Sequence, residues 1–350
     1  MLVVGSSLRR EVPIIAHRIR KGAVRHGTQV ALVNPHPQEL MFPVAAQFTS
    51  NGLGMAQHVA ALLVAALRSS GKSIPQDLAP ALEGVVPTSD HERVAKLLAG
   101  EGLRVILLGG VTERHVAYSE IRALARALAV ATGAVIGCLP DGGNAVGAAL
   151  AGATPHRGAG GRPVAEPGLS ALEMLNARLR GYVLVGGIEF ADLAPSPSFE
   201  SALQSAECVV ALTPYAGSEQ LANSTVILPV AAFAETSGTW VNVEGRWQSV
   251  PGAARPPGEA RPAWKVLRVL GNLLALPGFD YVSSEDVRDE LLRELGGAGA
   301  DPAPAFVPGR LSAVDSTREL GIYRVDAVVR RSRPLQETRD GRADAGGGER

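Results

Sequence analysis

Residues 235–248 read Glu235-Thr236-Ser237-Gly238-Thr239-Trp240-Val241-Asn242-Val243-Glu244-Gly245-Arg246-Trp247-Gln248, and they place acidic, amide and guanidinium groups around two glycines. A short apolar run precedes them, Val226-Ile227-Leu228-Pro229, which is typical of a buried β-strand that ends at a proline. Gly238 and Gly245 allow the chain to turn back. We therefore expect residues 235–248, here named the ribbon, to lie over strand ends and to line a crevice.

Upstream of the ribbon, apolar runs that predict strands alternate with periodic segments that predict helices. The predicted strands are 2–4, 29–33, 103–108, 134–136, 182–185 and 208–212, and the predicted helices include 13–24, 51–67, 90–98, 113–130 and 198–205. Several strands end at glycine, namely at Gly5, Gly109-Gly110 and Gly186-Gly187. Loops gather in this way at the carboxyl edge of a parallel sheet, where ligand crevices lie. The pattern predicts an α/β fold with a mostly parallel sheet and flanking helices.

Three regions are expected along the chain. Residues 1–249 should form the α/β domain. Residues 250–330 should form a helical C-terminal extension with helices at 263–274 and 284–295, the second capped by Ser283 or Ser284. Residues 331–350 should be a disordered tail, because the chain there offers little apolar surface to bury.

Composition limits the classes of partner. Among 350 residues, lysine plus arginine equals aspartate plus glutamate at 34 each, so no overall field attracts nucleic acid or an anionic membrane. The apolar run 59–67 is too short to span a bilayer and predicts a buried helix. The first residues read as a strand rather than as a signal peptide.

The sequence gives little indication of a metal site. Cys138 and Cys208 lie far apart and no Cys-x-x-Cys is present, so we expect two small core residues and no iron–sulfur cluster held by this chain. His91-Glu92-Arg93-Val94-Ala95 opens like a zinc-protease motif, but Ala95 replaces the second histidine. We expect His91 to lie in a solvated first turn of a helix.

The ribbon and the strand before it resemble the molybdopterin oxidoreductase superfamily, where a Glu-x-x-Gly-Thr-x-x-Asn-x-Glu-Gly-Arg run follows a similar strand. Within that superfamily the chain resembles the large peripheral subunits of NADH-quinone oxidoreductase, respiratory complex I. The resemblance implies electron transfer from NADH to quinone by the whole complex, with other peripheral-arm subunits as partners. It also implies a position on the cytoplasmic, inner face of the cell membrane without direct insertion. The cluster-binding N-terminal modules of that family are not in this sequence, so we expect a truncated product, a fragment or a split subunit.

Two turns depart from the superfamily pattern. The usual Gly-x-Asn-Pro and Asp-Pro-Arg turns, which hold the nucleotide end of the cofactor, correspond to Gly5-Ser6-Ser7-Leu8 and Asn34-Pro35-His36. A carboxylate and a guanidinium are thereby lost, and no cysteine is placed to bind molybdenum. We expect a vestigial crevice without a cofactor in this chain. Its residues would be Gly5, Ser6, Ser7, Asn34, Gly109, Gly110, Gly186, Gly187, Glu235, Thr239, Asn242, Glu244 and Arg246.

Two hypotheses follow from different classes of protein. In the first, the chain is a structural or assembly domain of the respiratory complex with no catalytic site of its own. In the second, it is a molybdopterin-binding oxidoreductase fragment whose site another chain completes. For the ribbon, we expect the side chains of Glu235, Thr239, Asn242, Glu244 and Arg246 to join the carboxyl edge of the sheet, the alternative being a solvent-exposed loop.

Overall fold

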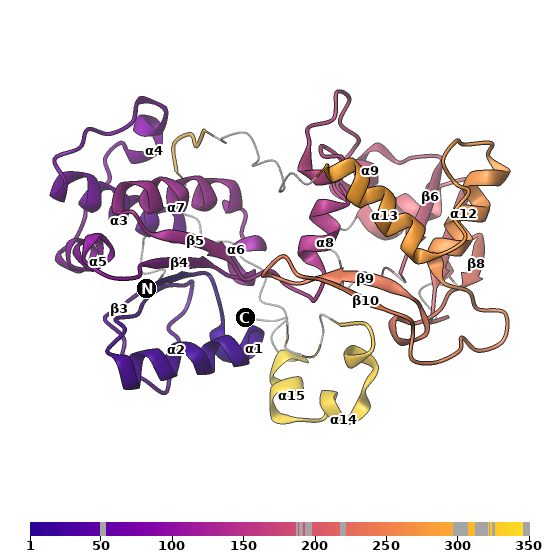
Figure 1. The fold of residues 1–350 in the computed structure, drawn as a ribbon, viewed down its shortest axis with the longest axis horizontal. Helices are drawn as coiled ribbons and strands as arrows, with labels where there is room; N and C mark the ends of the chain where they lie inside the picture. Colours follow the sequence, from indigo (N-terminus) through magenta and orange to yellow (C-terminus); the bar gives the residue numbers. More distant parts are fainter. Residues whose placement is uncertain are drawn as a thin grey trace. The chain divides into compact units, whose positions relative to one another are not determined.

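The computed structural model describes residues 1–49, 54–186, 188, 192, 198–217, 222–296, 307–311, 321, 323 and 326–345 (Figure 1). The chain divides into two compact units, which are described separately. Unit 1 comprises Met1–Gly142, Pro304–Ile322 and Asp344–Arg350, and unit 2 comprises Gly143–Ala303 and Tyr323–Ala343. This division at residue 142 differs from the boundary at 249 expected from the sequence. It places the ribbon and the later helices in the same unit.

Unit 1 contains a parallel sheet whose described strands have the order β3-β2-β1-β4-β5. The strands are β1 (Leu2–Val4), β2 (Ala31–Val33), β3 (Ala46–Phe48), β4 (Val105–Leu108) and β5 (Val135–Cys138). Val4 pairs with Val33 on one side and with Leu108 on the other. The order reverses between β1 and β4, and the loops after these two strands therefore lead to opposite faces. This is the topological switch point, where open α/β sheets usually bind ligands.

Helices cover both faces of this sheet. Figure 1 shows α3, α5 and α7 on one side and α1 and α2 on the other. Neighbouring residues of β1 follow this arrangement, since Val3 packs in the core cluster of α2 whereas Leu2 and Val4 pack in that of α3 and α7. The helices and turns are α1 (Leu8–Glu11), α2 (Pro13–His26), α3 (Met55–Ser69), η1 (Gln76–Leu78), α4 (Ala79–Leu82), α5 (Ser89–Ala99), α6 (Gly110–Glu113) and α7 (Tyr118–Thr132).

Helix α3 is buried on almost every side, which explains the continuous apolar run at 59–67 and confirms the buried helix. Within the described residues, no helix has both the length and the apolar character needed to cross a membrane. Helix α2 shows the usual terminal signals. Pro13 stands in its first turn, and Gly27 ends it in the left-handed conformation at φ 67°.

Unit 2 contains a separate parallel sheet with the order β6-β7-β8. Its strands are β6 (Gly181–Val185), β7 (Cys208–Thr213) and β8 (Val226–Pro229), and helices α9 (Ala171–Ala177) and α10 (Ser198–Ser205) accompany them. Tyr182 and Val209 of this sheet pack with Leu175, Phe199 and Leu203 of the two helices. The parallel α/β class is therefore confirmed, but the strands are divided between two sheets.

The ribbon forms a hairpin of two antiparallel strands, β9 (Gly238–Val241) and β10 (Trp247–Val250). The other elements of this unit are α8 (Ala145–Leu150), η2 (Ala159–Gly161), η4 (Phe233–Glu235), α12 (Ala263–Leu273) and α13 (Ser284–Leu295). Ser283 caps α13, because its hydroxyl accepts a 3.1 Å hydrogen bond from the backbone N–H of Asp286. The helix and its N-cap therefore agree with the sequence prediction.

The C-terminal residues differ from the expected disordered tail. The structure places η5 (Val329–Arg331), α14 (Arg333–Gln336) and α15 (Arg339–Ala345) there. The Gln336 amide donates to the carbonyls of Tyr323 (3.0 Å) and Val329 (3.3 Å), and the Arg331 guanidinium lies 4.1 Å from the ring centroid of Tyr215. Polar and cation–π contacts hold this segment. The prediction of disorder considered only its apolar side chains and therefore missed these contacts. The run Ile322-Tyr323-Arg324-Val325, whose residue types favour a strand, lies outside the described residues except for Tyr323, which is in a turn.

Both cysteines differ from their expected burial. Cys138 and Cys208 are exposed free thiols. Each stands at the end of its strand, Cys138 closing the edge strand β5 and Cys208 opening β7. A position within an apolar run therefore did not ensure burial. Among the described residues, no group of three or more His, Cys, Asp or Glu is placed to hold a metal ion.

His91 also differs from expectation, since its side chain is only 1% exposed. Its Nε2 lies 3.1 Å from Nδ1 of His58 on α3, and the ring of Phe48 stacks on it with centroids 4.4 Å apart. The backbone N–H of Thr88 donates to His91 Nδ1 at 3.1 Å, so the ring proton is on Nε2 and is donated to His58. The prediction of a solvated first turn is wrong because this face of α5 packs against α3.

Candidate functional site

The turn after β1 lies at the switch point of unit 1. Its hydrogen-bond donors are already bonded to a side chain of the protein. The Ser7 backbone N–H (3.0 Å) and the Ser6 hydroxyl (3.1 Å) both donate to Oε2 of Glu11. A small-residue turn of this kind can offer such donors to a phosphate. In the structure the Glu11 carboxylate takes the position that an anion would need. No pattern in the sequence had marked Glu11.

Asn34, at the end of β2, braces the same turn. Its Oδ1 accepts from the Ser6 backbone N–H at 2.9 Å, and its Nδ2 donates to the Ser6 carbonyl at 3.3 Å. Asn34 is 2% exposed and Ser6 is fully buried. Both ends of the amide are thus bonded within the protein. An aspartate here would lose the donor to the carbonyl, so the amide suits a structural role rather than ribose binding.

The glycines at the switch point allow close packing. Gly5 has φ +60°, and a Cβ at this position would overlap the hydroxyl of Thr112. A Cβ at Gly109 would lie 2.6 Å from the Gly5 carbonyl oxygen, and one at Gly110 would overlap the carboxylate of Asp141. Glycine is therefore required where the loops after β1 and β4 meet. The predicted residues Gly5, Ser6, Ser7, Asn34, Gly109 and Gly110 are brought together, but atoms of the protein fill the space beside them.

A guanidinium connects the loops around this turn. Arg114 Nη2 lies 2.7 Å from Oε1 of Glu11, and Nη1 is paired with Asp141. The backbone N–H of Asp141 donates to Glu113 at 3.3 Å. Burial raises the pKa of Glu113, with a smaller contribution from Glu11, and Arg114 opposes the rise. Three carboxyl groups around one guanidinium disfavour an added anion, so these residues do not fit the phosphates of a pterin dinucleotide.

The ribbon has mainly local hydrogen bonds. Asn242 Oδ1 accepts from the backbone N–H groups of Glu244 (3.0 Å) and Arg246 (2.9 Å), which closes the hairpin turn. Glu235 accepts from the Ala232 backbone at 3.0 Å, and the Thr239 hydroxyl lies 2.9 Å from that of Ser249. The side chains of Glu244 and Arg246 are exposed. The expected network of these side chains across the sheet edge is absent from the described residues, and the tip matches the alternative of a solvent-exposed loop.

Of the two glycines predicted after β6, the structure describes Gly186. Gly186 follows β6 with φ +94° and open space beside its α-carbon. Gly187 lies outside the described residues. The predicted set therefore falls into a group in unit 1 and a group in unit 2, with different surroundings.

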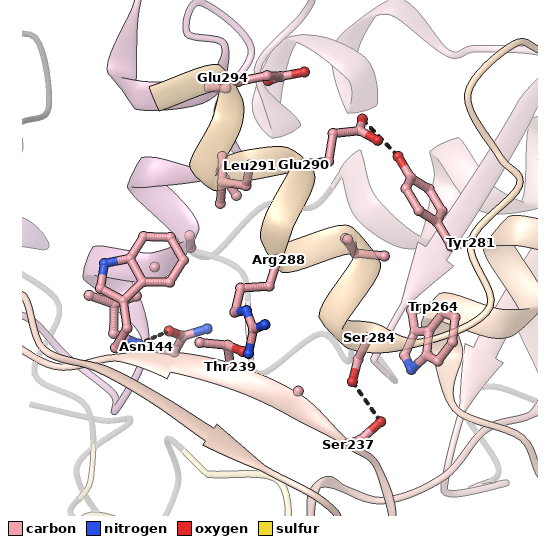
Figure 2. Close-up of a pocket in the computed structure, with 18 residues that line it drawn as sticks. Asn144, Ser237, Thr239, Trp264, Tyr281, Ser284, Arg288, Glu290, Leu291 and Glu294 are labelled. Atoms are coloured by element: carbon pink, nitrogen blue, oxygen red, sulfur yellow. Dashed lines mark hydrogen bonds between the residues drawn. The ribbon is translucent and has the colours of Figure 1, made fainter. Parts of the chain in front are cut away.

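Beside the ribbon, unit 2 has a cavity of about 410 Å³ (Figure 2). Its lining combines residues of the hairpin with residues of α8, α12 and α13. Trp247, Trp264 and Tyr281 supply aromatic surface, and the ribbon contributes Ser237, Gly238 and Thr239. Of the five ribbon residues predicted to line a crevice, Thr239 lines this cavity, whereas Glu235, Asn242, Glu244 and Arg246 do not. The partners in α8 and α13 were missed.

Side-chain hydrogen bonds join the ribbon to the cavity walls. The Val241 backbone N–H donates to Asn144 Oδ1 at 2.8 Å, and the Ser284 hydroxyl donates to that of Ser237 at 2.9 Å. In Figure 2 the Arg288 side chain extends from α13 toward Thr239. One sequence signal could have identified this wall, because the lining residues of α13 recur every three or four positions. Ser284, Val287, Arg288, Leu291 and Glu294 follow this spacing, and Glu290 also lines the cavity.

Comparisons with known proteins identify related sequences. Over 278 residues the chain is 31% identical to the G subunit of NADH-quinone oxidoreductase from Streptomyces coelicolor, a match that covers 73% of this chain and 30% of the relative. It is 30% identical over 138 residues to the nitrate reductase of a Synechocystis strain, covering 38% of this chain and 19% of that enzyme. The chain therefore spans less than a third of the length of these relatives.

A solved structure with the same fold is a chain of the formyltransferase/hydrolase complex of Methylorubrum extorquens, determined with methylofuran. The TM-score is 0.50 at 16% identity, covering 84% of this chain and 74% of the other. This likeness concerns the fold alone. The family model for molybdopterin oxidoreductases matches residues 1–273, which include both parallel sheets and the ribbon. The chain belongs to the molybdopterin oxidoreductase family.

Proposed function

We propose that this chain is a structural domain of the peripheral arm of an NADH-quinone oxidoreductase, on the cytoplasmic side of the membrane, with no cofactor of its own. In this role it supports electron transfer from NADH to quinone by positioning neighbouring subunits. The match to the Streptomyces coelicolor relative favours this role over others, since it extends over 73% of the chain.

The observation that carries the proposal is the position of Glu11. In a family whose fold implies a pterin dinucleotide, its carboxylate uses the donors of the Gly5-Ser6-Ser7 turn and is itself paired with Arg114. Asn34 uses both ends of its amide on the same turn. These groups would have to leave one another before they could bind phosphate or ribose.

The second candidate is an oxidoreductase fragment that binds molybdopterin with residues of another chain. The match to nitrate reductase favours it, although that match covers 38% of the chain against 73% for the NADH-quinone oxidoreductase relative. Such an enzyme would need the cofactor to displace the side chains at the switch point.

Affinity purification of the tagged chain from its native cells tests both candidates. The structural role predicts co-purification of NADH-quinone oxidoreductase subunits in fixed ratio and no stoichiometric molybdenum or pterin on the chain after the complex is dissociated. Near-equimolar molybdenum on the dissociated chain would establish the second candidate. Isolation without any subunit of the respiratory complex, under conditions that keep that complex intact, would contradict the first.

A further inference from the structure

The cavity beside the ribbon has the properties of a ligand site. Its volume of about 410 Å³ lies within the ~300–1,000 Å³ typical of small-molecule pockets. Trp247 comes from β10, Trp264 from α12, and Tyr281 from the segment before α13. Three aromatic side chains from separate elements thus contribute to one lining. Large flat surfaces of this kind favour contact with another aromatic ring.

One polar group of the lining lacks a partner. The indole Nε1 of Trp264 is buried and has no hydrogen-bond acceptor among the described residues. A buried donor without a partner is unfavourable, and an acceptor that reaches it removes this cost. Figure 2 shows this nitrogen on the side of the ring that faces Ser284 and Ser237, two residues that also line the cavity.

The charged groups of the lining are engaged within unit 2. Glu290 accepts a 2.8 Å hydrogen bond from the Tyr281 hydroxyl. The Arg288 guanidinium binds Asp289 through Nε at 2.7 Å and Ser249 through Nη1 at 3.2 Å. Glu294 adds a further carboxylate to the lining. Two carboxylates against one neutralised guanidinium disfavour an anionic ligand.

We propose that this cavity binds a flat, uncharged aromatic molecule that carries a carbonyl oxygen or ring nitrogen as acceptor for the Trp264 indole N–H. The aromatic side chains of the lining contact the ring of the ligand, and its acceptor atom accepts a hydrogen bond from the Trp264 indole N–H. Such binding is separate from the role in a respiratory complex proposed above. Ligand binding can therefore be tested in the isolated chain, independently of any subunits of a respiratory complex.

Coumarin is a suitable probe, because it is planar, neutral and carries a lactone carbonyl. The chain has three tryptophans, so a ¹⁵N-labelled sample gives three indole N–H signals, which Trp264→Phe and Trp240→Phe variants assign. Titration of the full chain with coumarin should shift the Trp264 signal saturably. Trp264→Phe should weaken coumarin binding at least tenfold. Trp240→Phe should leave it within about twofold, since Trp240 does not line this cavity.

A second pair of variants tests the cavity without changing Trp264. Ala148 lines the cavity from α8, and the neighbouring Ala149 does not. Both side chains are exposed, so a larger residue is tolerated at either position. Ala148→Phe should abolish the coumarin shift by filling the cavity, whereas Ala149→Phe should preserve it.

Several results would overturn the proposal. They are the absence of any Trp264 shift up to the solubility of coumarin, a shift confined to Trp240, or equal binding by the Ala148→Phe and Ala149→Phe variants. A Trp264 shift with choline but not with coumarin would also overturn it, since that result would identify a cation site.

Discussion

The turn at the switch point of unit 1 and the ribbon of unit 2 both carry polar side chains and glycines just after buried strands, yet they use them differently. In unit 1 a carboxylate, an amide and a guanidinium pair with one another around Gly5 and Gly109. In unit 2 the ribbon bonds mainly to itself and leaves a cavity beside it. Polar residues and glycines after a buried strand can therefore be filled in by neighbouring side chains, as in unit 1, or lie beside an open cavity, as in unit 2. Hydrogen-bond partners, rather than the motif, distinguish the two outcomes.

The largest effect is expected from Arg114→Ala. Removal of this guanidinium takes the ion-pair partner away from the partly buried carboxylates of Glu11 and Asp141, which should lower the free energy of unfolding by about 3 kcal/mol. Arg93→Ala is the control, because its pair with Asp90 is largely exposed and should contribute less than about 1 kcal/mol. Urea unfolding at pH 7 measures both. Equal losses would mean that the switch point of unit 1 is not held by this network.

A pH-dependent effect of similar size is expected from His91, in the same unit. Burial, and next the neighbouring His58, lower its pKa to about 4, with Asp90 acting in the opposite direction. The unfolded chain then binds more protons than the folded one between about pH 6.5 and 4. The free energy of unfolding should therefore fall by up to about 3 kcal/mol as the pH decreases through this window.

Chemical unfolding at pH 7 and at pH 5 tests the histidine, with His91→Gln as the comparison. The variant should lose part of its stability at pH 7 and show a weaker decline toward pH 5. A parent and a variant with the same pH slope would assign the acid sensitivity to other groups.

A smaller effect is expected when the family's usual carboxylate is restored by Asn34→Asp. The new side chain cannot donate to the Ser6 carbonyl, which Asn34 Nδ2 contacts at 3.3 Å, and the site is buried. A loss of about 2 kcal/mol is expected, measured as a lower thermal midpoint. A more stable variant that also binds a pterin dinucleotide would show that the turn retains its ancestral use.

The smallest effect is expected at the tip of the ribbon. Arg246→Ala and Glu244→Ala remove exposed side chains and should change the free energy of unfolding by less than about 0.5 kcal/mol. Asn242→Ala should cost about 1 kcal/mol, because its Oδ1 accepts two backbone hydrogen bonds of the turn. Differential scanning calorimetry of the three variants separates these cases. A large loss for Arg246→Ala would restore the network across the sheet edge that the sequence suggested.

Local signals predicted the elements of this fold well. The strand at Val226–Pro229 and the helices at Ser198–Ser205 and Ser284–Leu295 have the bounds expected from periodicity and caps. The division into two sheets could not be predicted in this way, because an apolar run indicates a strand without indicating its neighbours. The predicted exposure of His91 and the predicted burial of Cys138 were wrong for the same reason. Burial depends on which elements pack against a position, and the local sequence does not indicate them.

The candidate sites were predictable only as far as their residues follow strands. Gly5, Ser6, Asn34 and Gly109 were expected to meet, because loops of parallel strands gather at one edge. Glu11 and Arg114 were missed, since nothing local distinguishes a charged residue that closes a turn from one that faces solvent. The wall of the cavity formed by α13 was missed because a helical segment does not indicate which distant hairpin it will cover.

The position of Glu11 makes it a competitor of any phosphate at the turn after β1. Because carboxylate and turn belong to one short stretch of chain, the competition is intramolecular, and it acts with an effective concentration that does not depend on the amount of protein. A free anion would have to exceed that concentration, and to compensate for the separation of Glu11 from Arg114, before it occupied the turn. Cofactor binding at this turn would therefore depend on displacing or replacing Glu11 before improvements in direct cofactor contacts could raise the affinity.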